Sequence, residues 1–138
     1  MNITEDYVSF EVAKLLNEKG FGEKTLSYYE DNVLCHGDWF EWNRSPLGHI
    51  AAPTQQMAMK WLREVYHIEI NITFGFPFID GKQQYKYFWS IVRVCDSHLE
   101  YPMDDPNRAY YNEKMADSYE EAVEAALKYT FENLENLM

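Results

Sequence analysis

The feature that most constrains this fold is a segment of strict alternation over residues 67–76. Apolar and polar side chains take turns along it, with Ile68, Ile70, Ile72, Phe74 and Phe76 on one side and His67, Glu69, Asn71 and Thr73 on the other. A period of two predicts a half-buried β-strand. An Asp80-Gly81 pair, typical of tight hairpin turns, then precedes a nearly continuous apolar run over 85–95, which predicts a strand buried on both faces. The sequence therefore predicts an antiparallel hairpin that another layer must cover.

A two-residue loop at Asp80-Gly81 sets the register of this hairpin. It pairs apolar residues across one face of the ribbon: Phe74 with Tyr87, Ile72 with Trp89, and Ile70 with Ile91. It also places Pro77 opposite Gln84. Because proline has no N–H to donate to a strand pair, we expect a bulge or a wider loop near the tip.

Three further segments have the apolar spacing of amphipathic helices. We expect helices at about 5–19, 54–66 and 118–136. Each has a recognisable start signal: Thr4 for the first, Pro53 or Thr54 for the second, and the capping pair Ser118 and Glu121 for the third.

The remaining segments are expected to be strands and loops. A second hairpin is predicted over 25–36, because Asp31-Asn32 tolerates the positive φ of a tight turn. Glycine and proline interrupt 37–52, where we expect a strand around 39–42 followed by a loop. Residues 96–116 have no clear period and are expected to form a long loop.

Together these elements predict a single α+β domain over residues 1–138, in the order α-β-β-(β)-α-β-β-α. We expect an antiparallel sheet packed on one face by about three helices. The net charge of −11 disfavours direct binding to nucleic-acid phosphates or to an anionic membrane. The apolar runs are shorter than the ~20 residues of a spanning helix, and no basic leader begins the chain, so we expect a cytoplasmic protein.

One stretch from each predicted helix carries a resemblance to a known family. The stretches are ITEDYVSFEVAKLL (3–16), APTQQMAMKWLRE (52–64) and SYEEAVEAALKY (118–129). They resemble the short uncharacterised proteins of gut Bacteroidales genomes, which are often encoded in prophage or mobile-element regions. The resemblance covers the three helices and spans most of the chain. It implies an intracellular, bacterial, phage-derived setting and brings no activity and no catalytic residue with it.

Soft metal ligands occur at two places in the chain. Cys35-His36 and the Cys95-x-x-His98 pair would together supply four ligands of the kind that zinc prefers. Adjacent residues of a strand point to opposite faces, however, so Cys35 and His36 would not easily share one ion. We expect no metal, no cofactor and two free thiols.

The candidates for acid–base chemistry are His36, Asp38 and His49. A general base must lie within hydrogen-bond reach of the proton it takes, and these residues alone do not establish that geometry. No nucleophile elbow and no phosphate-binding glycine loop occurs in the sequence. We therefore expect no catalytic residue, and a small hydrolytic or metal-dependent enzyme remains an alternative.

An aromatic cluster over 39–44 places large rings beside a planar cation, a composition common at binding hot spots, but a strand with one face in the core and the other at an edge explains the same residues and is favoured over exposed binding rings. The candidate binding surface comprises Trp39, Trp42, Arg44, Tyr101, Tyr110 and Tyr111. The leading hypothesis is a small non-enzymatic binding or accessory module that recognises another protein or pairs with itself as a homodimer.

The last predicted helix concentrates acidic side chains: Asp117, Glu120, Glu121, Glu124, Glu132 and Glu135, against Lys128 alone. An acidic nucleic-acid mimic would use such a stripe to occupy a basic DNA-binding protein. A solvated helix face explains the same residues, so the mimic is a further alternative.

Overall fold

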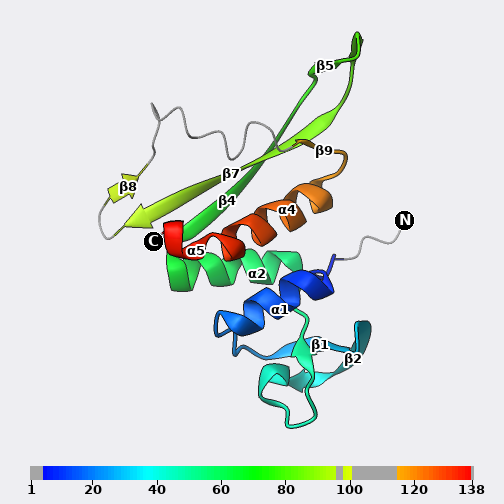
Figure 1. Ribbon diagram of the computed structural model, residues 1–138, viewed down its shortest axis with the longest axis vertical. Coiled ribbons are helices and arrows are strands. Elements are labelled where there is room, and N and C mark those ends of the chain that lie inside the picture. Colours follow the sequence, from blue (N-terminus) through cyan, green and yellow to red (C-terminus); the bar gives the residue numbers. More distant parts are fainter. Residues whose placement is uncertain (1–4, 96–97, 101–114, 138) are drawn as a thin grey trace.

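The structure, a computed structural model, describes residues 5–95, 98–100 and 115–137 of the 138-residue chain. It has the predicted α+β architecture, in which helices pack beside small antiparallel sheets (Figure 1). The predicted order of elements is found, with additional short strands. Within these ranges, no helix is long and apolar enough to cross a membrane.

Helix α1 (Phe10–Glu18) begins later than the sequence predicted. Ser9 caps it, because the Ser9 Oγ accepts the N–H of Val12 at 3.2 Å. The segment before the cap is not helical, since the N–H of Val8 donates to the carbonyl of Pro53 at 3.0 Å. The predicted start near residue 5 is therefore wrong, because this segment makes backbone hydrogen bonds to the chain that precedes the second helix.

The second helix is confirmed. Helix α2 (Gln55–Trp61) continues into the π-helical turn η2 (Leu62–Tyr66), so that the two together fill the predicted range. Thr54 is the cap, and its side chain accepts the N–H of Met57 at 3.2 Å.

The third helix is also confirmed. Helix α4 (Tyr119–Glu132) is followed by the short helix α5 (Leu134–Leu137). The Ser118 Oγ accepts the N–H of Glu121 at 3.1 Å, which is half of the predicted capping pair. The Glu121 carboxylate reaches back to the N–H of Asp117 at 3.2 Å and so satisfies one more donor at this end.

Strands β4 (Ile68–Gly75) and β7 (Lys86–Cys95) form the long ribbon that the alternation predicted. The predicted register is confirmed, with Phe74 paired to Tyr87, Ile72 to Trp89 and Ile70 to Ile91. Two short strands, β8 (His98–Glu100) and β9 (Met115–Ala116), pair with β7 where only a loop was predicted.

The tip of the ribbon keeps the same register. Strands β5 (Phe78–Ile79) and β6 (Lys82–Gln83) meet at a two-residue turn, in which Asp80 and Gly81 have φ of 52° and 77°. Across the tip, the carbonyl of Pro77 accepts the N–H of Gln84 at 2.9 Å. The predicted bulge or wider loop is therefore wrong, because the proline offers its carbonyl to the pair and needs no N–H there.

The second hairpin forms a separate small sheet in the order β2-β1-β3. Its strands are β1 (Thr25–Glu30), β2 (Val33–Phe40) and β3 (Ile50–Ala51). The turn at Asp31-Asn32 has the expected positive φ values, 48° and 69°. The strand predicted around 39–42 is only partly correct: β2 ends at Phe40, and the 3₁₀ turn η1 (Trp42–Arg44) follows.

The hydrophobic core lies between the ribbon and the helices. Trp89, Ile70 and Ile91 on one face of the ribbon belong to the same buried cluster as Val123 and Leu127 of α4. Figure 1 shows the outer end of the ribbon, toward β5, extending past the start of α4. The outer part of the predicted doubly buried strand is therefore exposed, and Tyr85 keeps 44% of its surface open to solvent.

Candidate functional site

One of the predicted binding residues, Trp39, lines an apolar hollow. The Trp39 side chain is 55% exposed and lies beside Leu26, which is 51% exposed. Pro53, which precedes α2, and Met57 of α2 line the same hollow. Its volume is about 310 Å³. We call this the apolar hollow; its remaining lining residues are Glu5, Tyr7, Thr25, Ala52 and Thr54.

An irregularity in the strand pairing positions Trp39. Thr25 pairs with Phe40 while Ser27 pairs with His36, so three residues of β2 lie opposite the single residue Leu26. Such a bulge bends a strand and redirects its side chains. Gly37 starts the bulge, and a Cβ there would lie 3.1 Å from the Trp42 ring and 3.2 Å from the Tyr28 ring. The glycine therefore lets the two rings close against the bulged strand.

Trp42 is a scaffold residue and not a free binding group. Its ring stacks on Tyr28 with the centroids 4.1 Å apart, and its Nε1–H donates to the Thr25 carbonyl at 2.9 Å. Both contacts hold the turn η1 against β1. Arg44, the cation of the predicted surface, is 72% exposed and reaches Glu41 at 3.5 Å, and it does not line the apolar hollow.

The predicted residues Tyr101, Tyr110 and Tyr111 lie outside the described residues.

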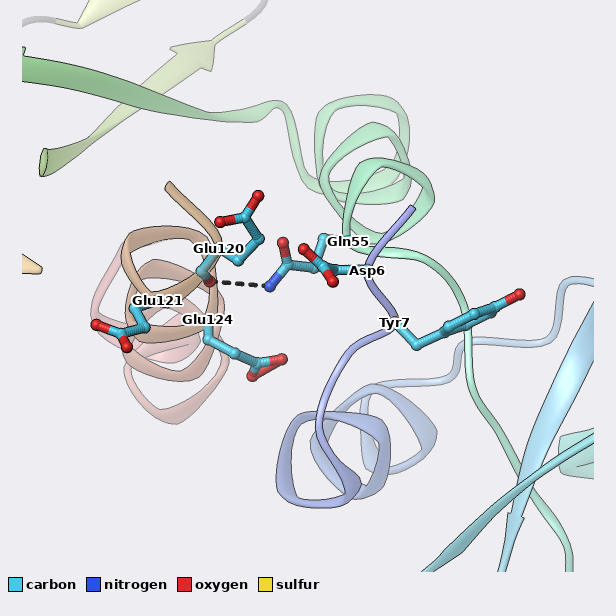
Figure 2. A pocket seen from close by; sticks show the side chains of 6 residues that line it. All are labelled: Asp6, Tyr7, Gln55, Glu120, Glu121 and Glu124. Atoms are coloured by element: carbon cyan, nitrogen blue, oxygen red, sulfur yellow. Dashed lines mark hydrogen bonds between the residues drawn. The ribbon is translucent and has the colours of Figure 1, made fainter. Parts of the chain in front are cut away.

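A second hollow, of about 340 Å³, lies between α4 and the segment that precedes α1. Its lining is mostly acidic and comprises Asp6, Glu120, Glu121 and Glu124 with Tyr7 and Gln55. Figure 2 shows the Asp6, Glu120 and Glu124 side chains around this space, while the Glu121 carboxylate points away from them. We call it the acidic hollow. The buried Gln55 side chain fixes its walls, because the Gln55 Nε2–H donates to the Glu120 carbonyl at 3.0 Å (Figure 2).

Glu124 is the one carboxyl of this hollow that is partly buried. Burial raises the pKa of Glu124 above 4.5, and the nearby Glu11 carboxylate adds to the increase. The backbone N–H of Ser9 donates to Glu124 Oε1 at 2.6 Å and partly opposes this shift in pKa. Glu124 therefore joins α4 to the start of α1 and also supplies negative charge to the hollow.

Tyr7 connects the two hollows. Its backbone forms a β-bridge with Thr54, which fixes the segment before α1 against the start of α2. In Figure 2 its ring points away from the carboxylates, and its centroid lies 5.5 Å from the His36 ring. Tyr7 lines both hollows, so the apolar and acidic spaces are adjacent. We call the combined region the Tyr7 surface. No sequence pattern marks Tyr7 as a binding residue, because only the bridge to Thr54 brings it there.

The candidate catalytic histidines are occupied by local contacts. The Nδ1 of His49 lies 3.1 Å from Ser45 Oγ, and the same hydroxyl oxygen accepts the N–H of Leu47 at 3.2 Å. The His49 Nε2 lies 3.9 Å from Glu30, which is beyond hydrogen-bond distance. The Nδ1 of His36 lies 2.6 Å from the Oγ of the fully buried Ser27. These contacts use the Nδ1 atoms to hold β1, β2 and the following loop together, and the Ser27 hydroxyl that faces His36 is fully buried.

No group of three or more His, Cys, Asp or Glu side chains is placed to hold a metal ion in the part of the chain that the structure describes. The side chains of Cys95 and His98 lie outside it, so the four-ligand arrangement stays untested.

The acidic residues of the last helix do not form one exposed stripe. Asp117 pairs with Lys86 of the ribbon, and Glu124 turns inward to Ser9. Lys128 of the same helix reaches Glu11 of α1 at 3.0 Å. A nucleic-acid mimic would present carboxylates at regular spacing along one surface, so this scattered arrangement counts against it.

No protein-family model matches the chain, and no curated protein or solved structure has a significant similarity to it. Its function is therefore inferred from the chemistry of its own surface.

Proposed function

We propose that this chain is a small non-enzymatic binding module that recognises a segment of another protein in which an apolar side chain is followed by a basic one. The observation that carries this proposal is that Tyr7 lines both the apolar hollow at Trp39 and the acidic hollow. One surface therefore offers adjacent sites for an apolar anchor and for a cation.

The chemistry of each hollow suits one of these groups. The apolar hollow, about 310 Å³, lies at the lower end of the range for ligand pockets and is large enough for one aromatic or branched side chain. Tryptophan is enriched among the residues that dominate binding energy, and Trp39 is the exposed ring at this hollow. Carboxylates favour lysine and arginine, and a net charge of −11 increases the rate of encounter with basic partners.

The setting follows from the family resemblance. In a bacterial cell that carries a prophage, the partner would be a cytoplasmic protein of the host or of the phage. Such a partner would expose a short basic and apolar segment.

A displayed peptide library, selected on the purified chain, tests the proposal. We expect the selected peptides to share an aromatic or aliphatic residue next to lysine or arginine, and to bind with micromolar affinity. Trp39→Ala should weaken binding at least tenfold, which corresponds to about 1.4 kcal/mol. Phe78→Ala is the matched control, because Phe78 is also an exposed aromatic residue, 76% exposed, and lies on the distant ribbon tip.

The acidic hollow has a separate readout. Asp6→Asn combined with Glu120→Gln should remove the preference for basic residues and reduce the salt dependence of binding, while the apolar preference remains. Peptides without a shared apolar and basic pattern, or unchanged binding by the Trp39→Ala variant, would contradict the proposal.

A further inference from the structure

Strand β2 is the end strand of the small sheet, and its outer edge is open. The sheet has the order β2-β1-β3, and among the described residues no other strand pairs with β2 on the side away from β1. Every residue of β2 is exposed or half-buried. An open strand edge presents unpaired backbone N–H and C=O groups, which can pair with an added strand.

The strand register shows which backbone groups of β2 face outward. The two-residue turn at 31–32, with positive φ at both positions, makes its closing residues Glu30 and Val33 a hydrogen-bonded pair. Hydrogen-bonded and non-hydrogen-bonded pairs alternate from there along an antiparallel hairpin. Leu34 and His36 therefore lie in non-hydrogen-bonded pairs and direct their N–H and C=O groups away from β1.

A hydrogen bond on the far side of β1 supports this assignment. Ser27 is the partner of His36 in the register, and the Ser27 carbonyl accepts the N–H of Ala52 at 2.9 Å. Ser27 thus turns its backbone away from β2, as a residue of a non-hydrogen-bonded pair does. The outer edge of β2 therefore offers two donors and two acceptors, from Leu34 and His36. The bulge that begins at Gly37 ends the regular pairing, so this edge site covers residues 34–36.

The charge around the edge site indicates which kind of segment fits it. From residue 25 to residue 43 the chain has four acidic residues and no lysine or arginine. Glu30, Asp31 and Asp38 of this set are exposed. Edge strands are commonly protected from further pairing by lysine or proline, and β2 has neither. A second copy of β2 would bring like charges together, whereas a basic segment would be attracted.

The edge site adjoins the Tyr7 surface. The His36 ring lies 5.5 Å from the Tyr7 ring, measured between centroids, and Tyr7 lines both hollows. Trp39 follows the edge site on the same strand and lines the apolar hollow. An extended chain advances about 3.3 Å per residue, so a segment paired to 34–36 needs about three more residues to reach Trp39. One extended segment can therefore occupy the edge and the hollow together.

We propose that the partner segment binds as an added strand on β2, with its backbone paired to Leu34 and His36 and its apolar side chain in the hollow at Trp39. This inference rests on the proposed function and adds the conformation of the partner, an extended basic segment of about six residues. The main-chain hydrogen bonds contribute affinity for any sequence, while the two hollows select the side chains.

N-methylation of the peptide backbone tests the pairing. The probe is the tightest-binding peptide from the displayed library, synthesised with a single N-methyl group at each position in turn. In either strand direction, only alternate peptide amides face β2. We expect two positions, two residues apart, at which N-methylation weakens binding at least tenfold. The position between them is the matched control, because it carries the same methyl group on an amide that faces away, and binding there should change by less than about twofold.

Amide hydrogen exchange of the full chain, measured by NMR, gives the matching readout on β2. In the free chain the N–H groups of Leu34 and His36 should exchange fast, whereas the N–H of Cys35, which pairs with Tyr28, should be protected. Saturating probe peptide should slow exchange at Leu34 and His36 at least tenfold and leave Cys35 unchanged.

The outcomes separate this inference from the proposed function. Peptides that depend on Trp39 but show no alternation in either measurement would overturn the added strand and leave the proposed function standing. A library that selects no peptide would overturn the proposed function and the added strand together. Protection of Leu34 and His36 that grows with the concentration of peptide-free chain would also overturn the inference, because the occupant of the edge would then be a second copy.

Discussion

The two aromatic surfaces of this protein, the segment 37–44 and the outer ribbon, have similar compositions but different anchors. In the segment 37–44 the indole of Trp42 donates to the Thr25 carbonyl, and the Asn43 amide donates to the Phe21 carbonyl at 2.7 Å. On the outer ribbon, the rings of Phe74, Phe76, Tyr85 and Tyr87, which we call the aromatic ladder, contact mainly one another. An aromatic residue is therefore part of the scaffold when hydrogen bonds tie it or its neighbours to backbone far away in the sequence. The number of rings that lie close together does not decide this.

The largest expected effect is on stability, and it distinguishes the two tryptophans of the segment 37–44. Trp42→Ala should lower the free energy of unfolding by about 2–4 kcal/mol, because it removes a half-buried ring that stacks on Tyr28 and a hydrogen bond to Thr25. Trp39→Ala should change it by less than about 0.5 kcal/mol, since the Trp39 side chain is mostly exposed. Urea unfolding of both variants measures the contrast, and equal losses would break the distinction between scaffold and surface.

Asn43 provides the next largest effect. Its amide nitrogen donates to the Phe21 carbonyl, and its Oδ1 accepts the N–H of Ala51 at 2.8 Å, so one side chain joins η1, β3 and the end of α1. Asn43→Ala leaves both backbone groups without this partner and should cost about 1–3 kcal/mol. Asn71→Ala, at an exposed site on β4, is the control and should stay within about 0.5 kcal/mol of the wild type. The denaturant midpoints of the two variants measure this contrast, since only the anchored Asn43 should contribute to the stability of the fold.

The elements that the sequence predicted correctly rest on local signals. The alternation over 67–76, the turn at Asp80-Gly81 and the cap at Ser118 all act within a few residues, and the structure confirms each of them. The prediction of where α1 begins was wrong because a distant segment competes for the same backbone. Val8 pairs with Pro53 instead of entering the helix.

The candidate site could be predicted only in part for the same reason. Trp39 was identified because it belongs to a dense aromatic run, and it does line the apolar hollow. Trp42 belongs to the same run, but its role depends on Tyr28 and Thr25, which local pattern cannot connect to it. The aromatic ladder was visible as alternating phenylalanines, but only the length of α4 decides which of them are covered.

A smaller effect is expected on the ribbon. Phe74→Ala removes the stack on Tyr85 and should lower the free energy of unfolding by about 0.5–1.5 kcal/mol, the range for an aromatic pair. The loss should be smaller than for Trp42→Ala, because no hydrogen bond to another element is broken. Urea unfolding of this variant measures the loss. A loss as large as that of Trp42→Ala would indicate that the ladder is part of the scaffold.

The smallest effect is a pH dependence that Glu124 gives to the acidic hollow. Because burial holds the pKa of Glu124 above 4.5, this carboxyl takes up its proton earlier than an ordinary glutamic acid as the pH falls from 7. The acidic hollow then loses one charge, and the affinity for a basic peptide should fall a few-fold.

The same protonation should also affect stability. Since the pKa of Glu124 is raised in the folded state, protonation should stabilise the fold as the pH falls through that pKa, whereas ionised Glu124 is unfavourable above it. Glu124→Gln keeps an oxygen that accepts the Ser9 N–H but cannot titrate, so in this variant both pH effects should be absent. Peptide affinity and urea unfolding, each measured from about pH 7 down to about pH 5, check the two effects, and a pH dependence that is unchanged by Glu124→Gln would contradict them.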